Sequence, residues 1–447
     1  MLRRRLDLRR GGAGPRLLAA AAAAVAVAVA AAAPAAPSGQ FAGPQRLLPD
    51  VGGPSSIVFN PIERQYIHMV DGSYHSHADL LADTVDRGVS FRVGSLGAAH
   101  RGNTDVAYNP QRNQFLIANR NAPVLPTAEL FDADGTRLVA DIPLSPNVGE
   151  SYSEPPRSAL SYDPAVAYNT SAREWLIAYT EDTDDGASVV RATRLDAGGA
   201  VLSTATMVAD LGQRNDSPDL AYRPASEDYL LVWSAVHGSG TSDVYAQRLD
   251  TSGDPRGAPR RLSRGHNEAG PHAGVAPAIA VNSTSNDALV VWSDAFEIHG
   301  CRVSGRTVRQ DRCLQVSSMG VKGDLGWADA RAAYPAVAYS PPGDEYLVVW
   351  SGVDPTLPGS PALNPQIVGQ HLTRSAREVG PDDFAITTDM LPGQKIDSGV
   401  FDMPSVAADS RAPRYLVSYW ASYHPGGPGE LVQMGRLLQT ARAQITP

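Results

Sequence analysis

The residues Pro218-Asp219-Leu220-Ala221-Tyr222 begin a stretch that Tyr229-Leu230-Leu231-Val232-Trp233 completes after a gap of six residues. The second half holds the β-branched and aromatic residues that suit a strand. The gap contains Pro224, which is typical of a turn. Apolar and polar residues do not alternate along residues 229–233, which indicates a strand covered on both faces. The stretch therefore predicts a buried β-hairpin.

Variants of this hairpin recur seven times with a constant internal spacing. Its first anchor residues are Phe59, Tyr108, Tyr168, Tyr222, Val281, Tyr339 and Ala408. Its second anchor residues, each seven positions later, are Tyr66, Phe115, Trp175, Tyr229, Ala288, Tyr346 and Tyr415. Successive first anchors are 49, 60, 54, 59, 58 and 69 residues apart. A fixed spacing inside the unit and a variable one between units predicts a repeated hairpin joined by loops of different length.

Two further strands follow most of the hairpins. We expect third strands at residues 189–195, 244–249, 298–303, 367–372 and 431–437. We expect weaker fourth strands at residues 138–142, 206–209, 260–262, 314–316 and 384–387. Four antiparallel strands in each of seven repeats predict an all-β fold, a seven-bladed β-propeller. Six or eight blades remain open if one copy is cryptic.

The ends of the repeat array suggest how the ring closes. Gly43-Pro44-Gln45-Arg46-Leu47 is similar to Ala258-Pro259-Arg260-Arg261-Leu262, which lies in an expected fourth strand. We therefore expect the mature N-terminus to supply the outer strand of the seventh blade, leaving no open sheet edge. The alternative is that residues 441–445 take that place.

Residues 1–40 form a separate segment. A start with six arginines and one aspartate precedes an unbroken apolar run over residues 17–33 and then small residues. This order is typical of a secretory signal peptide followed by a short linker. We expect an extracellular protein with one domain, residues 41–447. A membrane anchor is the alternative, although the run is shorter than the ~20 residues of a typical span.

The charge and the cysteines limit the function classes. The chain carries −9, and residues 1–40 carry +5, so residues 41–447 carry −14. An acidic body disfavours nucleic acid as a partner. The two cysteines, Cys301 and Cys313, predict one disulfide in an exported chain, because no further metal ligands are near them. We expect no cofactor and a monomer.

A family resemblance rests on two motifs. Tyr346-Leu347-Val348-Val349-Trp350 and the strand Val244-Tyr245-Ala246-Gln247-Arg248-Leu249-Asp250 resemble repeats of secreted bacterial β-propeller proteins. The resemblance covers nearly all of residues 41–447 and implies the fold and export. It implies no particular activity, because propellers host many.

Candidate site residues lie in the long loops that join the second strand to the third and each blade to the next. Loops on a rigid frame commonly carry function. We expect ligand-binding residues at His266, His272, Asp324, Trp327, Asp329 and Asp397, with Glu150, Lys395 and Asp402 nearby in such loops. Paired carboxylates could cleave a glycosidic bond, and Trp327 could stack on a sugar. Solvated acidic loops are the alternative interpretation.

Two stretches offer metal ligands without predicting a metal site. Asp182-Thr183-Asp184-Asp185-Gly186 could bind calcium but lacks the later glutamate of an EF-hand loop. His75, His77 and Asp79 could contribute to a zinc site, with an ordinary strand start as the alternative.

Two functional hypotheses follow. The first is an exported binding or scaffold protein whose loops contact a glycan, a cell wall or a protein. The second is a polysaccharide-acting glycoside hydrolase or lyase that uses carboxylates around the central channel. The sequence contains no Gly-x-Ser-x-Gly elbow, phosphate-binding loop or dinucleotide fingerprint, so we expect a binder rather than an enzyme.

Overall fold

The computed structural model describes the greater part of the chain from Arg46 onward. The described residues are 46–51, 55–71, 76–82, 88–93, 104–120, 126–145, 164–183, 187–211, 214–236, 242–263, 276–294, 297–305, 308–319, 332–352, 366–387, 394–395, 403–423 and 430–441. They all belong to one compact unit, Gly39–Pro447. Among them, no helix is long and apolar enough to cross a membrane.

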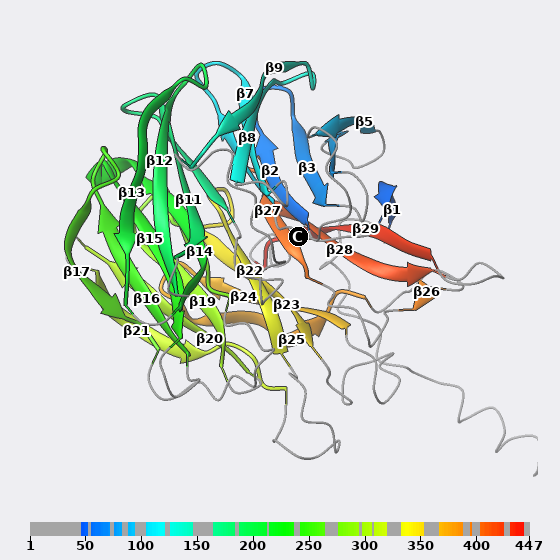
Figure 1. The fold of residues 1–447 in the computed structure, drawn as a ribbon. Coiled ribbons are helices and arrows are strands. Elements are labelled where there is room, and N and C mark those ends of the chain that lie inside the picture. The colour runs from blue at the N-terminus through cyan, green and yellow to red at the C-terminus, as the bar shows by residue number, and fades with distance from the viewer. Residues whose placement is uncertain are drawn as a thin grey trace, which may run out of the picture. The chain divides into compact units, whose positions relative to one another are not determined.

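The described residues form seven antiparallel β-sheets, which we call blades 1–7 in chain order (Figure 1). Blade 1 comprises β2 (Ser55–Asn60), β3 (Gln65–Asp71), β4 (Ser76–Ala82) and β5 (Gly88–Val93). Blade 2 comprises β6 (Asp105–Asn109), β7 (Gln114–Arg120), β8 (Pro126–Asp132) and β9 (Arg137–Pro143). Blade 3 comprises β10 (Ala165–Asn169), β11 (Glu174–Asp182), β12 (Ser188–Asp196) and β13 (Val201–Ala209).

The next three blades repeat the four-stranded pattern. Blade 4 comprises β14 (Arg214–Arg223), the 3-10 turn η1 (Pro224–Ser226), β15 (Asp228–Val236), β16 (Ser242–Leu249) and β17 (Pro255–Arg261). Blade 5 comprises β18 (Ala278–Val281), β19 (Ala288–Asp294), β20 (Glu297–Ser304) and β21 (Arg309–Gln315). Blade 6 comprises β22 (Ala332–Ser340), β23 (Glu345–Gly352), β24 (Gln366–Thr373) and β25 (Glu378–Ala385).

Blade 7 is completed by the N-terminal strand. It comprises β26 (Gln394–Lys395), β27 (Ser405–Ala408), β28 (Arg414–Tyr423), β29 (Glu430–Gln439) and β1 (Arg46–Val51). Strand β1 pairs with β29, with Arg46 opposite Gly435 and Leu47 opposite Met434. The predicted pairing of an N-terminal strand with the last blade is therefore confirmed. That this strand begins a mature chain stays a prediction.

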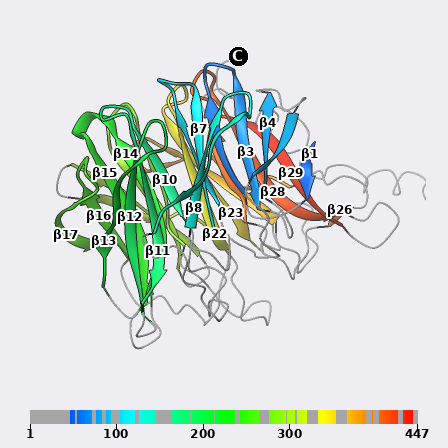
Figure 2. The ribbon, with the colours of Figure 1, turned by 45° about the horizontal axis from the view of Figure 1, so that its top comes forward.

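The seven first strands form a closed inner ring. Each contacts the first strand of the next blade, in the order β2, β6, β10, β14, β18, β22 and β27, and β27 contacts β2. Figure 2 labels three of these first strands, β10, β14 and β22. The structure thus confirms the seven-bladed propeller.

The spacing between the two anchors has a physical cause in the first turn of each blade. The anchors face each other across the hairpin, as Tyr222 faces Tyr229 with ring centroids 5.2 Å apart. The residue five positions after the first anchor has a left-handed backbone in six blades, with φ between +50° and +63°: Arg64, Asn113, Arg173, Glu227, Asn286 and Asp344. This conformation closes a turn of one length.

A short polar side chain braces the same turn in five blades. The residue after the first anchor accepts hydrogen bonds from the two backbone N–H groups two and three positions later, as Asn109 does from Gln111 and Arg112. Its counterparts are Asn60, Asn169, Asn282 and Asp409. All five side chains are buried. Asx turns of this kind specify the hairpin locally.

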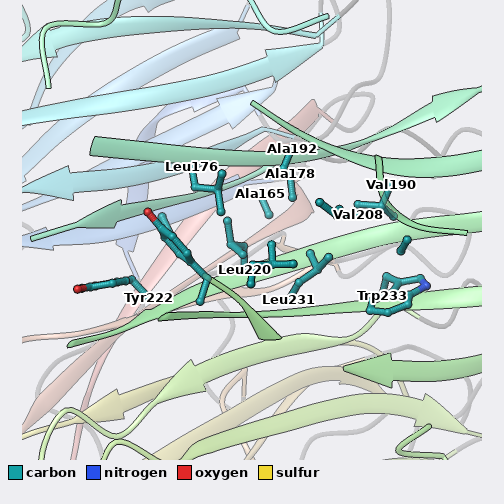
Figure 3. Packing of buried hydrophobic residues seen from close by; sticks show 14 of the residues in the cluster. Ala165, Leu176, Ala178, Val190, Ala192, Val208, Leu220, Tyr222, Leu231 and Trp233 are labelled. Atoms are coloured by element: carbon teal, nitrogen blue, oxygen red, sulfur yellow. The ribbon is translucent and has the colours of Figure 1, made fainter. Parts of the chain in front are cut away.

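Apolar residues of neighbouring blades pack face to face. Figure 3 shows Leu220, Leu231 and Trp233 of blade 4 facing Ala178 and Val208 of blade 3. Trp233 is fully buried, and burial of each such large side chain stabilises the fold by roughly 2–3 kcal/mol. The second strands are therefore covered on both faces, as the lack of alternation predicted.

The fourth strands begin earlier than predicted. Strands β13, β17, β21 and β25 start five to six residues before the predicted ranges 206–209, 260–262, 314–316 and 384–387, directly after a tight turn. The outermost strand of a blade is largely exposed, as in β17, whose residues are almost all exposed. Polar residues there carry no apolar signal, so the apolar pattern predicted only the last part of each strand.

The two cysteines form the predicted disulfide. Cys301 on β20 and Cys313 on β21 face each other in register with their Cα atoms 4.0 Å apart. The bond joins the third and fourth strands of blade 5.

Candidate functional site

All six predicted ligand-binding residues lie outside the described part of the chain. They are His266, His272, Asp324, Trp327, Asp329 and Asp397. Glu150, Asp402 and His75 also lie outside it, as do residues 184–186 of the calcium candidate. These assignments stay predictions. Within the described ranges, no group of three or more His, Cys, Asp or Glu residues could hold a metal ion.

The inner ring contains two carboxylates at equivalent positions. Three residues before the first anchor, blades 2 and 4 carry Asp105 and Asp219, whereas the other blades carry Ser56, Ala165, Ala278, Ala336 and Ser405. Both aspartates are half-buried. They are the first candidates for acid or base chemistry, because enclosed carboxylates commonly have shifted pKa values.

Asp105 connects three consecutive blades. Its Oδ1 accepts hydrogen bonds from the Ser56 hydroxyl of blade 1, at 2.7 Å, and from the backbone N–H of Val106, at 2.8 Å. Its Oδ2 accepts one from the backbone N–H of Val166 in blade 3, at 2.8 Å. Burial raises the pKa of Asp105 to about 6, against the lowering effect of these donors.

Asp219 makes the same connection from blade 4 to blade 5. Its two oxygens accept hydrogen bonds from the backbone N–H groups of Leu220, at 2.7 Å, and Ile279, at 2.8 Å. Burial raises the pKa of Asp219 to about 7, and the negative charge of Asp105 adds to the rise. Each aspartate therefore clamps neighbouring first strands together. Each could also exchange a proton near neutral pH.

A second candidate site lies on the face that carries the hairpin turns. A hollow of about 410 Å³ opens there between blades 2 and 3. We call it the arginine hollow, and it is lined by Gln111, Arg112, Tyr168, Arg173, Asp196 and Ala197. Its size is within the range of small-ligand sites.

The polar groups of the arginine hollow are held by specific contacts. The Tyr168 hydroxyl donates to Gln111 Oε1, at 2.9 Å, and Gln111 Nε2 donates to the backbone carbonyl of Thr170, at 2.9 Å. Burial raises the pKa of Tyr168, while the charges of Arg112 and Arg173 oppose the rise. Both guanidinium groups therefore lie close enough to the Tyr168 hydroxyl to act on it electrostatically.

The arginine pair is specific to this junction of the ring. Its members occupy the fourth position after the anchor in one blade, Arg112, and the fifth position in the next, Arg173. At the other junctions the same two positions hold Glu63 with Asn113, Ala172 with Glu227, Ser226 with Asn286, Ser285 with Asp344, Gly343 with Pro413, and Ala412 with Arg64. The blade 2–blade 3 junction thus places two cations where the other six place at most one charged residue of either sign.

Neither candidate site can be recognised from a single loop, although a signal for each exists in the sequence. Aligning the seven copies on their first anchors shows aspartate at one position in copies two and four. It also shows that only copies two and three combine a cation four positions after the anchor in one copy, Arg112, with a cation five positions after the anchor in the next, Arg173. The turns share a backbone but differ in side chains, so a candidate site can also lie on the face that carries the turns.

Three asparagines begin Asn-x-Ser/Thr sequences, the pattern of N-glycosylation sites, and the structure excludes all three as sites. Asn169, Asn215 and Asn282 are fully buried. Asn215 Oδ1 accepts a hydrogen bond from the Trp233 indole N–H at 3.1 Å, and its Nδ2 donates to the Ser188 carbonyl at 2.9 Å. A bulky glycan does not fit at any of the three in the folded chain.

Comparisons with known proteins extend to the fold alone. No protein-family model and no curated protein match the chain. The Dos1 propeller is similar at 8% identity and a TM-score of 0.49, over 89% of this chain and 95% of that one. The Cps50 (Swd1) β-propeller domain of Myceliophteria thermophila is similar at 11% identity and a TM-score of 0.46, over 88% and 99%. A thermostable family-43 glycoside hydrolase is similar at 12% identity and a TM-score of 0.37, over 75% and 88%.

Proposed function

We propose that this chain is an exported binding or scaffold propeller that presents long loops on one face to a glycan, a cell wall or a protein. One observation carries the proposal: the long connections all leave the strands at the ends opposite the hairpin turns. They are residues 144–164, 262–277, 316–331, 353–365 and 386–404, against four to six residues in each first turn. The predicted ligand-binding residues all lie within these connections.

Export is supported by two features. Residues 1–40 have the order of charges and apolar residues that signal peptides share. The disulfide Cys301–Cys313 suits an oxidising compartment. The net charge of −9 argues against a nucleic-acid partner, and we propose that the chain acts as a monomer.

The two inner-ring carboxylates, Asp105 and Asp219, favour a second candidate function, a polysaccharide hydrolase or lyase. The raised pKa values of Asp105 and Asp219 would suit proton transfer near neutral pH. However, every oxygen of the two side chains accepts a backbone hydrogen bond from the inner ring. Such engagement favours a structural role, and we therefore place binding first.

The experiment applies a glycan array and a polysaccharide-cleavage screen to residues 41–447. We expect ligand capture without cleavage. We also expect capture to fall at least about tenfold on replacement of Trp327 and Asp329 by alanine, because loss of a stacked aromatic and a charged contact removes the main binding groups. Cleavage that disappears in Asp105→Asn and Asp219→Asn, with folding retained, would instead support the hydrolase or lyase.

A further inference from the structure

We propose that the arginine hollow binds an acidic sugar through its single carboxylate. The site lies on the face of the propeller that carries the first hairpin turns, which we call the turn face. The proposed function uses the opposite face, which carries the long connections and which we call the loop face. The site requires neither a metal nor a covalent step.

The charge of the hollow determines the class of ligand. In the described part of the chain, Arg112 and Arg173 have no ion pair, whereas other arginines pair with acidic residues, such as Arg194 with Glu174 at 2.6 Å. Guanidinium groups match the planar geometry of a carboxylate and form charge-assisted hydrogen bonds with it. The two cations and Asp196 leave the hollow at net +1, which suits one negative charge.

The remaining groups suit the hydroxyls of a sugar. Asp196 Oδ1 already accepts hydrogen bonds from the backbone N–H groups of Gly198 and Ala200, at 2.8 and 2.9 Å. Its second oxygen receives no hydrogen bond from the described residues. Because Asp196 lines the hollow, this oxygen is left to accept a hydrogen bond from a ligand hydroxyl. The Tyr168 hydroxyl donates to Gln111 and keeps lone pairs for a second hydroxyl.

Gly198 keeps the hollow open next to Arg112. A Cβ atom at this position would lie 3.7 Å from Arg112 Nη1. The neighbouring blades carry Asp134 and Ser252 at the same turn position. The glycine in blade 3 therefore leaves the guanidinium free of a side chain that would cover it.

At the corresponding junction of blades 1 and 2, the equivalent side chains bond to one another. There Asn113 accepts a hydrogen bond from the Tyr108 hydroxyl, at 2.7 Å, and donates one to Glu63 Oε1, at 2.9 Å. Tyrosine, amide and carboxylate bond to one another, and the one charge among the three groups is negative, so this junction offers no cation to an acidic ligand. Arg173 cannot accept a hydrogen bond from Tyr168, and the analogous network does not form in the described residues of blade 3.

Titration calorimetry with glucuronate tests the proposal, with glucose and inorganic phosphate as comparison ligands. The informative variants are Arg112→Ser and Arg173→Asn, because other blades carry serine and asparagine at these turn positions. Asparagine also tolerates the left-handed backbone of Arg173, where φ is +60°. We expect binding of glucuronate, weaker binding at high salt, no binding of glucose, and a loss of at least about tenfold in each variant.

Arg260→Gln is the matched control. Arg260 is exposed on β17, and the replacement removes the same charge far from the hollow. Unchanged binding in this variant, together with no loss of thermal stability in any of the three, supports a local effect. Absence of glucuronate binding, or binding that survives both arginine variants, would overturn the proposal. Phosphate binding as tightly as glucuronate would overturn the sugar assignment. Trp327 and Asp329 lie in the long connections and not in the hollow. A failure to bind glucuronate would therefore leave the glycan-array result of the proposed function unaffected.

Discussion

The junctions between blades 1 and 2 and between blades 2 and 3 use the same turn and differ in their side chains. The first is closed by Tyr108, Asn113 and Glu63 in a continuous network. The second is open and lined by Arg112 and Arg173. The backbone of both turns is set by a left-handed residue with φ of +55° and +60°.

The difference shows how a repeat frame acquires a site. Packing between blades and the braced turns hold the backbone, so the side chains four and five positions after the anchor can vary as long as the fifth residue keeps its left-handed backbone. A pair of substitutions there can replace a network of tyrosine, amide and carboxylate with two cations without changing the hairpin. Positions that are alike in all blades thereby supply the stability of a repeat protein. Positions that differ from blade to blade supply its specificity.

The largest expected effect comes from breaking the junction of blades 4 and 5, which a buried ion pair closes. Asp228 binds the buried Arg223 through both oxygens at 2.8 Å and also Arg248 at 2.6 Å, while Arg223 reaches the Gly305 carbonyl of blade 5. Asp228→Ala leaves a buried cation unpaired and should lower the free energy of unfolding by about 3–5 kcal/mol. Denaturant unfolding measures this loss.

The open junction supplies the control for that variant. Asp196 accepts hydrogen bonds only from turn N–H groups among the described residues, so Asp196→Ala should cost about 1 kcal/mol. Equal losses in the two variants would contradict the distinction between closed and open junctions.

A smaller effect should appear as pH dependence at the inner ring. The folded chain holds protons on Asp105 and Asp219 up to about pH 6 and 7, whereas an unfolded aspartate releases its proton near pH 4. The stability that they contribute is therefore complete below pH 4 and is lost as pH rises through 6 and 7. Acidification from pH 7.5 to 5 should raise the melting temperature of the natural chain relative to that of Asp105→Asn/Asp219→Asn.

The comparison with the double variant separates these two groups from the other carboxylates. Asp294 and Glu378, whose pKa values burial also raises, are present in both proteins and cancel. Parallel pH profiles would show that the two aspartates titrate normally in the fold.

The smallest expected effect concerns the open junction itself. Arg173→Asn should raise stability by a few tenths of a kcal/mol, because it removes repulsion by Arg112 at an exposed site. Arg112→Ser should act similarly, and the double variant should gain less than the sum, since the repulsion can be removed only once. Strict additivity in thermal unfolding would mean that the two cations do not interact.

The strand order and the disulfide were predictable, whereas the sites in the described residues were not. The anchors and their spacing are local features, because a left-handed residue and an Asx turn are encoded within a few positions. The early halves of β13, β17, β21 and β25 were missed because exposed strands carry no apolar pattern. The arginine hollow depends on residues 61 positions apart in the chain, Arg112 and Arg173, and no local pattern joins them.

By itself the sequence determined the repeat, because seven copies with one spacing bury the same apolar faces and leave few other arrangements. Only the tertiary structure decided which side chains meet between blades. It brought Asp105 to the N–H of Val166 and Arg112 to the turn of blade 3. Packing of neighbouring sheets places each turn beside the next one, and the charges that face each other there follow from that arrangement.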